Sequence, residues 1–226
     1  MAEEPILSHS SNSSPKRFLH PAGSPVAPPR LYGQRIMMRP LVAHDFEAWS
    51  EVRLRNVDWL TVWEPRRSDF LADPATDRDA FERRCIARDR ERQNGSAYTL
   101  GLFINNLLVG EVNINNVVRG AMQTGTIGYW IDRKHAGNGY VAEGVAAIMK
   151  FAFDDLNLHR LEVCIIPRNT NSKRVAEKLG LRLEGLAERF LEINGVWEDH
   201  YRYAITSEEW QERRDALTHQ WLTTKK

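Results

Sequence analysis

Residues 126–144 of the chain read TIGYWIDRKHAGNGYVAEG. An apolar, β-rich run over 126–131 leads into a Gly-x-Gly turn at Gly137 and Gly139. Apolar residues at helical spacing then predict a helix over 137–155. Glycines let the backbone turn tightly and bring its free N–H groups close to a ligand. Because unpaired amides and the positive end of a helix favour an anion such as a pyrophosphate, the stretch predicts a strand-to-helix phosphate site.

Basic side chains stand at the mouth of this turn, at Arg133, Lys134 and His135. The Gly-x-Gly pattern alone is a weak signal, because two turn glycines at the start of an ordinary helix give the same pattern. The stretch also lacks the Gly-Lys-Ser/Thr of a P-loop and the full glycine fingerprint of a Rossmann fold. More of the sequence is needed to specify the chemistry.

A second motif, PRNTNSKRVAEKLGL, occupies residues 167–181, and Glu184-Gly185 follows it. Together with AGNGYVAEG at 136–144, this motif resembles the GNAT acetyltransferase superfamily, within it the ribosomal-protein-alanine N-acetyltransferase branch. That branch typically reads Gln-Gly-Lys-Gly-Tyr-Ala-Thr-Glu-Ala, then Asn-x-x-Ser-x-Arg-Val-x-Glu-Lys-Leu-Gly-Phe, then a Glu-Gly turn. The resemblance is close over residues 125–186 and looser over 34–124.

Three positions of the glycine turn depart from the family pattern. Ala136 stands where the family usually has Gln or Arg, Asn138 replaces a common Lys, and Val141 stands where the family has Gly or Ala. Because backbone N–H groups would hold the phosphates, we expect these changes to weaken cofactor binding rather than abolish it. Arg133 and Lys134 would partly compensate.

The resemblance implies an α/β GNAT fold. In that fold a mixed, mostly antiparallel sheet is splayed between two parallel central strands, here 126–131 and 160–166, and helices cover both faces. It also implies acetyl-CoA as cosubstrate. The cofactor-binding residues that it implies are Trp130, Ile131, Asp132, Arg133, Lys134, Ala136, Gly137, Asn138, Gly139, Tyr140, Val141, Asn169 and Ser172.

Several of these residues carry a specific role in the resemblance. The backbone near residues 130–132 would pair with the pantetheine arm, and Asn169 would bond to it from the other side, although a plain helix cap is an alternative for Asn169. Ser172 would face the sulfur and protonate the leaving thiolate; its alternative is a solvent-facing helix residue. Tyr129 and Trp130 either pack the core or line the acceptor cleft.

An amine attacks a thioester only when neutral, so a base or a water relay must remove its proton. Glu192 and Glu111 are the candidate bases, because both lie on predicted strands that could approach the site. The position that corresponds directly to the family's carboxylate is Leu191, and one step along a strand reverses the face of the side chain. A solvated surface carboxylate is the alternative for each glutamate.

The rest of the chain supplies elements for a mixed sheet with helices on its faces. Asn194-Gly195 predicts a tight hairpin, Thr76 and Ser207 are expected to cap helices, and residues 59–73, with Trp59 and Trp63, form a loop or broken helix that could rim the acceptor entrance. Strands are predicted over 34–41, 97–104, 107–118, 126–131, 160–166, 181–193 and 196–205. Helices are predicted over 45–55, 76–93, 137–155 and 169–178, and from 207 onward.

Composition bounds the class of protein. The chain has 226 residues and a net charge of +1, which argues against a nucleic-acid-binding protein, although not against a local basic patch. Its two cysteines are too few for a disulfide framework, and its seven histidines lack paired metal-ligand spacing, so no metal is expected. No apolar run is long enough to span a membrane and no signal peptide is recognisable, so we expect a cytoplasmic protein. Residues 1–30 are predicted to be a disordered tail, and 31–226 a single domain.

The resemblance predicts an N-acetyltransferase that acts on a primary amine, in the first instance the N-terminal α-amine of a ribosomal protein. A small amine, such as an antibiotic, polyamine or amino acid, is an alternative acceptor. A non-catalytic acyl-CoA sensor is an alternative class. Neither nucleic acid nor membrane is expected as a direct partner, and the protein is expected to be a monomer or a homodimer.

Overall fold

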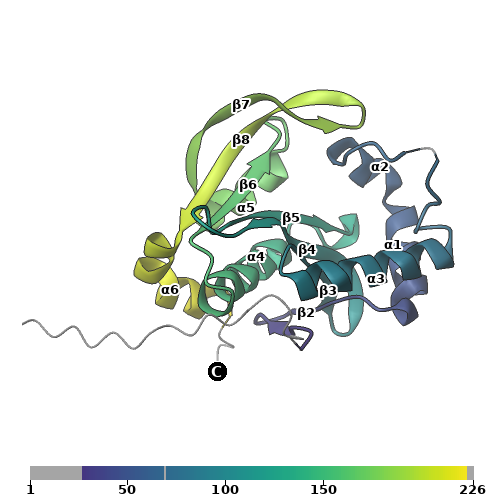
Figure 1. Cartoon of the computed structure of the whole chain (residues 1–226), viewed down its shortest axis with the longest axis horizontal. Coiled ribbons are helices and arrows are strands. Elements are labelled where there is room, and N and C mark those ends of the chain that lie inside the picture. The colour runs from purple at the N-terminus through teal and green to yellow at the C-terminus, as the bar shows by residue number, and fades with distance from the viewer. Residues whose placement is uncertain (1–26, 69, 223–226) are drawn as a thin grey trace, which may run out of the picture.

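The computed structural model describes residues 27–68 and 70–222, and eight strands in these ranges form one sheet (Figure 1). The strand order is β1-β2-β3-β4-β5-β6-β8-β7. Every neighbouring pair is antiparallel except β5 and β6, which are parallel. The strands are β1 Leu31–Tyr32, β2 Met37–Arg39, β3 Tyr98–Ile104, β4 Leu107–Val118, β5 Thr124–Ile131, β6 Arg160–Ile165, β7 Arg182–Ile193 and β8 Val196–Thr206. The predicted mixed, mostly antiparallel sheet is confirmed.

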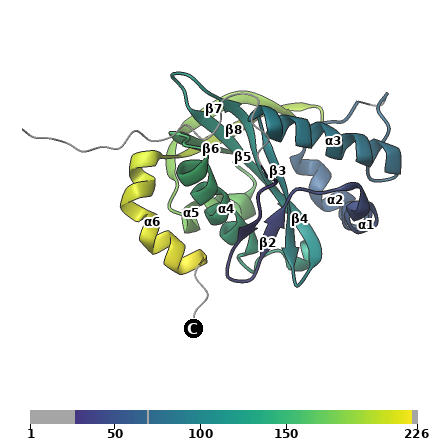
Figure 2. The ribbon, with the colours of Figure 1, turned by 60° about the horizontal axis from the view of Figure 1, so that its bottom comes forward.

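Helices cover both faces of this sheet, as predicted (Figure 2). The helices are α1 Phe46–Arg55, α2 Val57–Leu60, α3 Arg78–Asn94, α4 Tyr140–Lys150, α5 Thr170–Lys178 and α6 Ser207–Trp221. One face packs on α4, α5 and α6 through a large core that includes Val112, Ile148 and Trp210. The other face packs on α1 and α3 through a smaller core around Trp49 and Phe81. Alternation along β4 feeds both cores, since Leu108 points into the smaller core and Val109 into the larger one.

The two parallel strands separate along their length. β5 pairs with β6 only from Thr124 to Thr126, opposite residues 160–162. Beyond that point β5 stays with β4 as far as Ile131, while β6 continues on β8 as far as Ile165. The carboxyl ends of both strands are therefore free of each other, which is the predicted splay.

Three helix starts differ from the prediction. The helix predicted from Gly137 begins at Tyr140, because Gly137 and Gly139 have left-handed φ angles of 82° and 84° that no helix accommodates. Asp77 rather than Thr76 caps α3, by accepting a hydrogen bond from the Ala80 amide at 2.8 Å. Thr206 rather than Ser207 caps α6 and forms a reciprocal capping box with Glu209.

The two ends of the described chain meet beside the glycine turn. The Gln34 side chain donates to the Gln220 carbonyl at 2.9 Å, and the Gln34 backbone N–H donates to the Trp221 carbonyl. A Cβ added to Gly139 would lie 3.7 Å from the Trp221 ring. The predicted tail, residues 1–30, lies outside the described residues except for 27–30. Among the described residues, none of the helices has the length and apolar character needed to cross a membrane.

Candidate active site

The glycine turn presents an open helix terminus. After a 3₁₀ turn at Arg133–His135, the chain passes through Gly137 and Gly139 into α4. Gly139 occupies the N-cap position of α4 and offers no side chain to the first-turn amides. A Cβ added to Gly137 would meet no atom within 4 Å, so the space in front of this residue is open. Uncapped amides at the positive end of a helix are suited to an anion.

Asp132 anchors the turn to the end of α1. Its buried carboxylate accepts from Arg55 at 2.6 Å, from Asn56 at 2.9 Å and from His135 at 3.2 Å. Burial alone would raise the pKa of Asp132, but these hydrogen bonds outweigh burial and hold the pKa well below its usual range. The side chain of Asp132, a predicted cofactor-binding residue, is therefore occupied by hydrogen bonds within the protein.

The backbone at residues 130–132 is only partly available to a ligand. The Asp132 amide donates to the Val109 carbonyl at 2.7 Å, and the Ile131 carbonyl accepts from the Trp59 indole at 3.1 Å. Because backbone groups of successive residues on a strand face opposite sides, the Ile131 amide points away from β4 and toward the gap beside β6. Of the backbone groups predicted to pair with a pantetheine arm, the Ile131 amide is thus the one that remains available.

Arg35 was missed by the sequence analysis. Its guanidinium donates to the buried Glu143 in the first turn of α4 at 2.9 Å and to the Asn138 carbonyl at 3.1 Å, and it stacks on the Tyr140 ring. Arg35 lies 108 residues from Glu143 in sequence, so local spacing gave no signal of this pairing.

The second motif meets β5 through a pair of hydroxyls. The side chain of Asn169 caps α5 by accepting from the Ser172 amide at 3.0 Å, and its own amide group makes no hydrogen bond within the described part of the chain. The Ser172 hydroxyl lies 2.7 Å from the Tyr129 hydroxyl. Burial raises the pKa of Tyr129 to about 12, so its phenol is protonated at neutral pH. Tyr129, interpreted from sequence as a core or cleft residue, is the direct partner of the predicted acid.

Glu111 is one of the two predicted bases, and it lies in a buried ion pair. Its carboxylate accepts from Arg84 through both oxygens at 2.8 Å, from the Trp49 indole at 2.9 Å and from the Trp130 indole at 3.2 Å. A carboxylate has about four acceptor sites, and all of them are occupied here. The arrangement favours a structural role for Glu111.

Glu192 is the other predicted base, and it lies exposed on β7 opposite Trp197, near the tip of the hairpin. Its side chain makes no hydrogen bond or ion pair with any residue that the structure describes. Leu191 pairs with Glu198 and, by alternation, points to the other face of the strand. Of the two candidates, Glu192 is the one whose carboxylate has no partner among the described residues.

The hairpin tip closes on the loop after α2. The Asn194 amide donates to the Glu64 carbonyl at 2.8 Å, and the Glu64 side chain holds Arg53 through two hydrogen bonds of 2.7 and 2.6 Å. Arg53 in turn lies 5.1 Å from the centre of the Trp130 ring on β5. Strand, loop and hairpin are thereby joined around the ends of the splayed strands.

A cavity of about 340 Å³ lies beside this junction. It is lined by Pro167 and Arg168 after β6 and by Arg189 and Trp197 from the hairpin. Arg168 also stacks on Trp63, in the loop after α2, at 5.3 Å. The hairpin therefore lines this cavity directly, while Trp63 of the predicted aromatic rim contacts it through Arg168.

Comparisons with known proteins agree with this geometry. The model of the acetyltransferase (GNAT) domain matches residues 35–182. A probable N-acetyltransferase of Bacillus subtilis (strain 168), YjcK, is 37% identical over 178 residues, which are 77% of this chain and 96% of that protein. The [ribosomal protein uS5]-alanine N-acetyltransferase of Escherichia coli (strain K12) is 30% identical over 80% of this chain and 92% of its own length. The structure of Mycobacterium smegmatis RimJ in complex with CoA-disulfide is similar with a TM-score of 0.75 and 29% identity, covering 86% of this chain and 95% of that one.

Proposed function

Because this chain belongs to the GNAT acetyltransferase family, we propose that it transfers the acetyl group of acetyl-CoA to the N-terminal α-amine of a protein, most specifically a ribosomal protein. The observation that carries the acceptor is the 30% identity to the uS5-alanine N-acetyltransferase over 80% of this chain. The cavity between residues 166–168 and the hairpin supports it, because a peptide must leave the site toward solvent.

The residues of the glycine turn fit the pyrophosphate of acetyl-CoA. Gly137 faces open space and the first amides of α4 are uncapped, so backbone N–H groups can approach the phosphates. The Ile131 amide and the Asn169 side-chain amide would hold the pantetheine arm from the two sides of the gap. When bound, acetyl-CoA supplies a thioester carbonyl that a neutral amine can attack.

Ser172 supplies the proton for the leaving sulfur in this proposal. As the C–N bond forms and the C–S bond breaks, the Ser172 hydroxyl gives its proton to the leaving sulfur. The Tyr129 phenol, 2.7 Å away, stabilises the Ser172 oxygen by a hydrogen bond until a proton from solvent restores the hydroxyl. Because burial raises the pKa of Tyr129 to about 12, the phenol stays protonated at neutral pH and is available as a hydrogen-bond donor. Glu192, directly or through water, would take the proton from the incoming amine.

The test presents purified protein and acetyl-CoA with peptides beginning with Ala, Ser or Thr, and measures thiol release. Each peptide is matched by the same sequence with a blocked amino terminus, which separates the α-amine from lysine side chains. Free polyamines and aminoglycosides are offered at the same concentration. We expect the free peptides to be acetylated fastest and the blocked ones not at all. Faster acetylation of a small amine than of every peptide would contradict the protein acceptor.

A further inference from the structure

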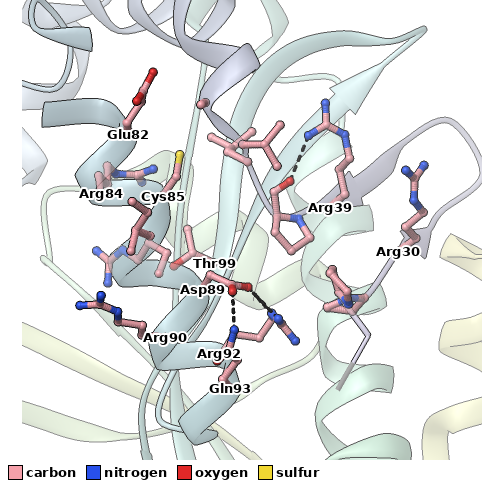
Figure 3. Close-up of a pocket in the computed structure, with 18 residues that line it drawn as sticks. Arg30, Arg39, Glu82, Arg84, Cys85, Asp89, Arg90, Arg92, Gln93 and Thr99 are labelled. Carbon is pink, nitrogen blue, oxygen red and sulfur yellow. Dashed lines mark hydrogen bonds and ion pairs between the residues drawn. The ribbon is translucent and has the colours of Figure 1, made fainter. Parts of the chain in front are cut away.

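A second and larger cavity, of about 810 Å³, lies between α3 and the strands β2 and β3 (Figure 3). Its volume is within the range of about 300–1,000 Å³ typical of ligand pockets. Its lining includes Arg90 of α3, Arg30 ahead of β1 and Thr99 of β3. None of the residues assigned above to the glycine turn, the Ser172 pair or the hairpin lines it. The mechanism proposed above therefore leaves this cavity without a role.

The inward face of α3 changes character along its length. Phe81 is fully buried, and Cys85, one turn later, packs against the same core. The next positions at helical spacing are Arg88 and Arg92, and both line the cavity. Arginines at positions that would normally be apolar call for an explanation, because such positions otherwise fill with core residues. At these two positions α3 presents arginines to the cavity in place of apolar side chains.

Cationic groups exceed anionic groups on the wall. Six arginines line the cavity against two acidic residues, Glu82 and Asp89. Four of the six are already paired: Arg39 with Asp45, Arg84 with Glu111, Arg88 with Glu91 and Arg92 with Asp89. Arg30 and Arg90 have no hydrogen-bond or ion-pair partner among the residues that the structure describes. In Figure 3 these two exposed side chains lie on opposite sides of the view, Arg90 on α3 and Arg30 on the segment ahead of β1.

An unsatisfied hydroxyl lies on the strand side of the cavity. The side-chain oxygen of Thr99 is buried and has no hydrogen-bond partner, and the residue is only 7% exposed. Buried polar groups are normally paired, so an orphaned hydroxyl on a cavity wall indicates a missing partner. Leu41, Pro40 and Ile86 make the neighbouring wall apolar. The cavity thus combines an apolar wall, a hydrogen-bonding group and two uncommitted positive charges.

We propose that this cavity binds a small organic anion, consisting of a carboxylate or phosphate head and a short apolar body. Either of the two exposed arginines at the cavity rim, Arg30 or Arg90, would bind the anionic head through charge-assisted hydrogen bonds. Thr99 would complete its hydrogen bonding with the ligand, and the apolar body would lie against Leu41 and Ile86. This site is separate from the acetyl-transfer site and does not depend on the acceptor proposed above.

The test uses octanoate and octyl phosphate as probes, because they share one chain length and differ in the anionic head. Octan-1-ol and octylammonium are the matched neutral and cationic compounds. Binding to the full chain is measured by calorimetry and by the shift in melting temperature. We expect one or both anions to bind and raise the melting temperature, and the alcohol and the amine to do neither. Failure of both anions to bind, or equal binding of the alcohol, would overturn the proposal.

Variants locate the binding. The double variant Arg30→Gln/Arg90→Gln should weaken binding of the anion by at least about tenfold, since each charge-assisted bond is strong. The control is Arg83→Gln, which removes an exposed arginine of the same helix that does not line the cavity and should change affinity less than about twofold. An unchanged affinity in the double variant would place the probe elsewhere, as would displacement of the probe by acetyl-CoA.

Thr99→Val supplies a second, independent readout. Valine has nearly the shape of threonine and carries no hydroxyl, so the unliganded variant should melt at a higher temperature than the wild type. The same variant should bind the anion several-fold more weakly, because the ligand loses its partner. A variant that is no more stable and binds the anion as well as the wild type would remove Thr99 from the site and contradict the proposal.

Discussion

Gly137 offers the sharpest residue-scale test of the phosphate turn. Its φ of 82° is tolerated by glycine and, less readily, by Asn and Asp, so Gly137→Asp and Gly137→Asn strain the backbone alike and differ in charge. We expect Gly137→Asp to weaken acetyl-CoA binding by about tenfold more than Gly137→Asn, which corresponds to about 1.4 kcal/mol. Calorimetry on the folded variants measures the difference. Equal affinities would mean that no anion approaches this turn.

Variants that remove the Ser172 or Tyr129 hydroxyl should lower kcat and leave the Kd for acetyl-CoA nearly unchanged. Ser172→Ala is expected to lower kcat by about 10²-fold, a typical loss for a positioned proton donor, with little change in the Kd for acetyl-CoA. Tyr129→Phe should cause a smaller loss, because it removes only the second member of the pair. Since the pKa of Tyr129 is about 12, the wild-type rate should show no titration of this phenol between pH 6 and pH 10. Equal losses in kcat and in cofactor affinity for Ser172→Ala would reduce Ser172 to a positioning role.

The same residues show what sequence could and could not predict about the site. Ser172 and Asn169 fall in one local motif, and their hydrogen bond follows from helix-cap geometry. The partners of Glu111 and Glu143 lie on other elements, so only the folded sheet brings Arg84 and Arg35 to them. A strand glutamate facing solvent and one facing an arginine look identical in sequence, so the sequence offered Glu111 and Glu192 alike as candidate bases.

At the scale of elements, order and type followed from the sequence except for the short strand β1 and the four-residue helix α2, while helix starts did not. Adjacent threonine, serine and aspartate residues can each cap a helix, and only backbone angles decide which of them does. Thr206 has an extended backbone, with φ −99° and ψ 168°, and therefore occupies the N-cap of α6, whereas Ser207 is already helical. Periodicity alone does not give strand direction. The parallel pairing of β5 and β6 was therefore expected only from the family motifs.

The cap of α6 yields an element-scale prediction. Thr206→Ala removes the acceptor for the Glu209 amide and half of the capping box, so the free energy of unfolding should fall by about 1 kcal/mol. Ser207→Ala is the matched control, and its effect should stay within about 0.5 kcal/mol. Urea denaturation of both variants compares the two directly. A larger loss in Ser207→Ala would return the cap to the residue predicted from sequence.

At the scale of the whole molecule, the junction of loop and hairpin should govern the acceptor and not the cofactor. Glu64→Gln removes the ion pair between Glu64 and Arg53 and loosens the loop that the Asn194 amide contacts. We expect the KM for an acceptor peptide to rise several-fold, because removing one member of an ion pair destabilises the loop far more than removing an exposed charge would. The Kd for acetyl-CoA should stay within about twofold. Glu51→Gln, which breaks an exposed pair with Arg55, is the control. A matching rise in the Kd for acetyl-CoA would show that the junction also shapes the cofactor site.

The meeting of Gln34 and Gly139 with Trp221 sets an order of events during synthesis of the chain. The glycine turn leaves the ribosome before α6 does, so every nascent chain passes through a stage in which the turn exists without the Trp221 ring behind it. The site for acetyl-CoA would accordingly be completed only after α6 has been synthesised. A message cut short within α6 would yield a chain that retains both motifs in its sequence and lacks a finished turn.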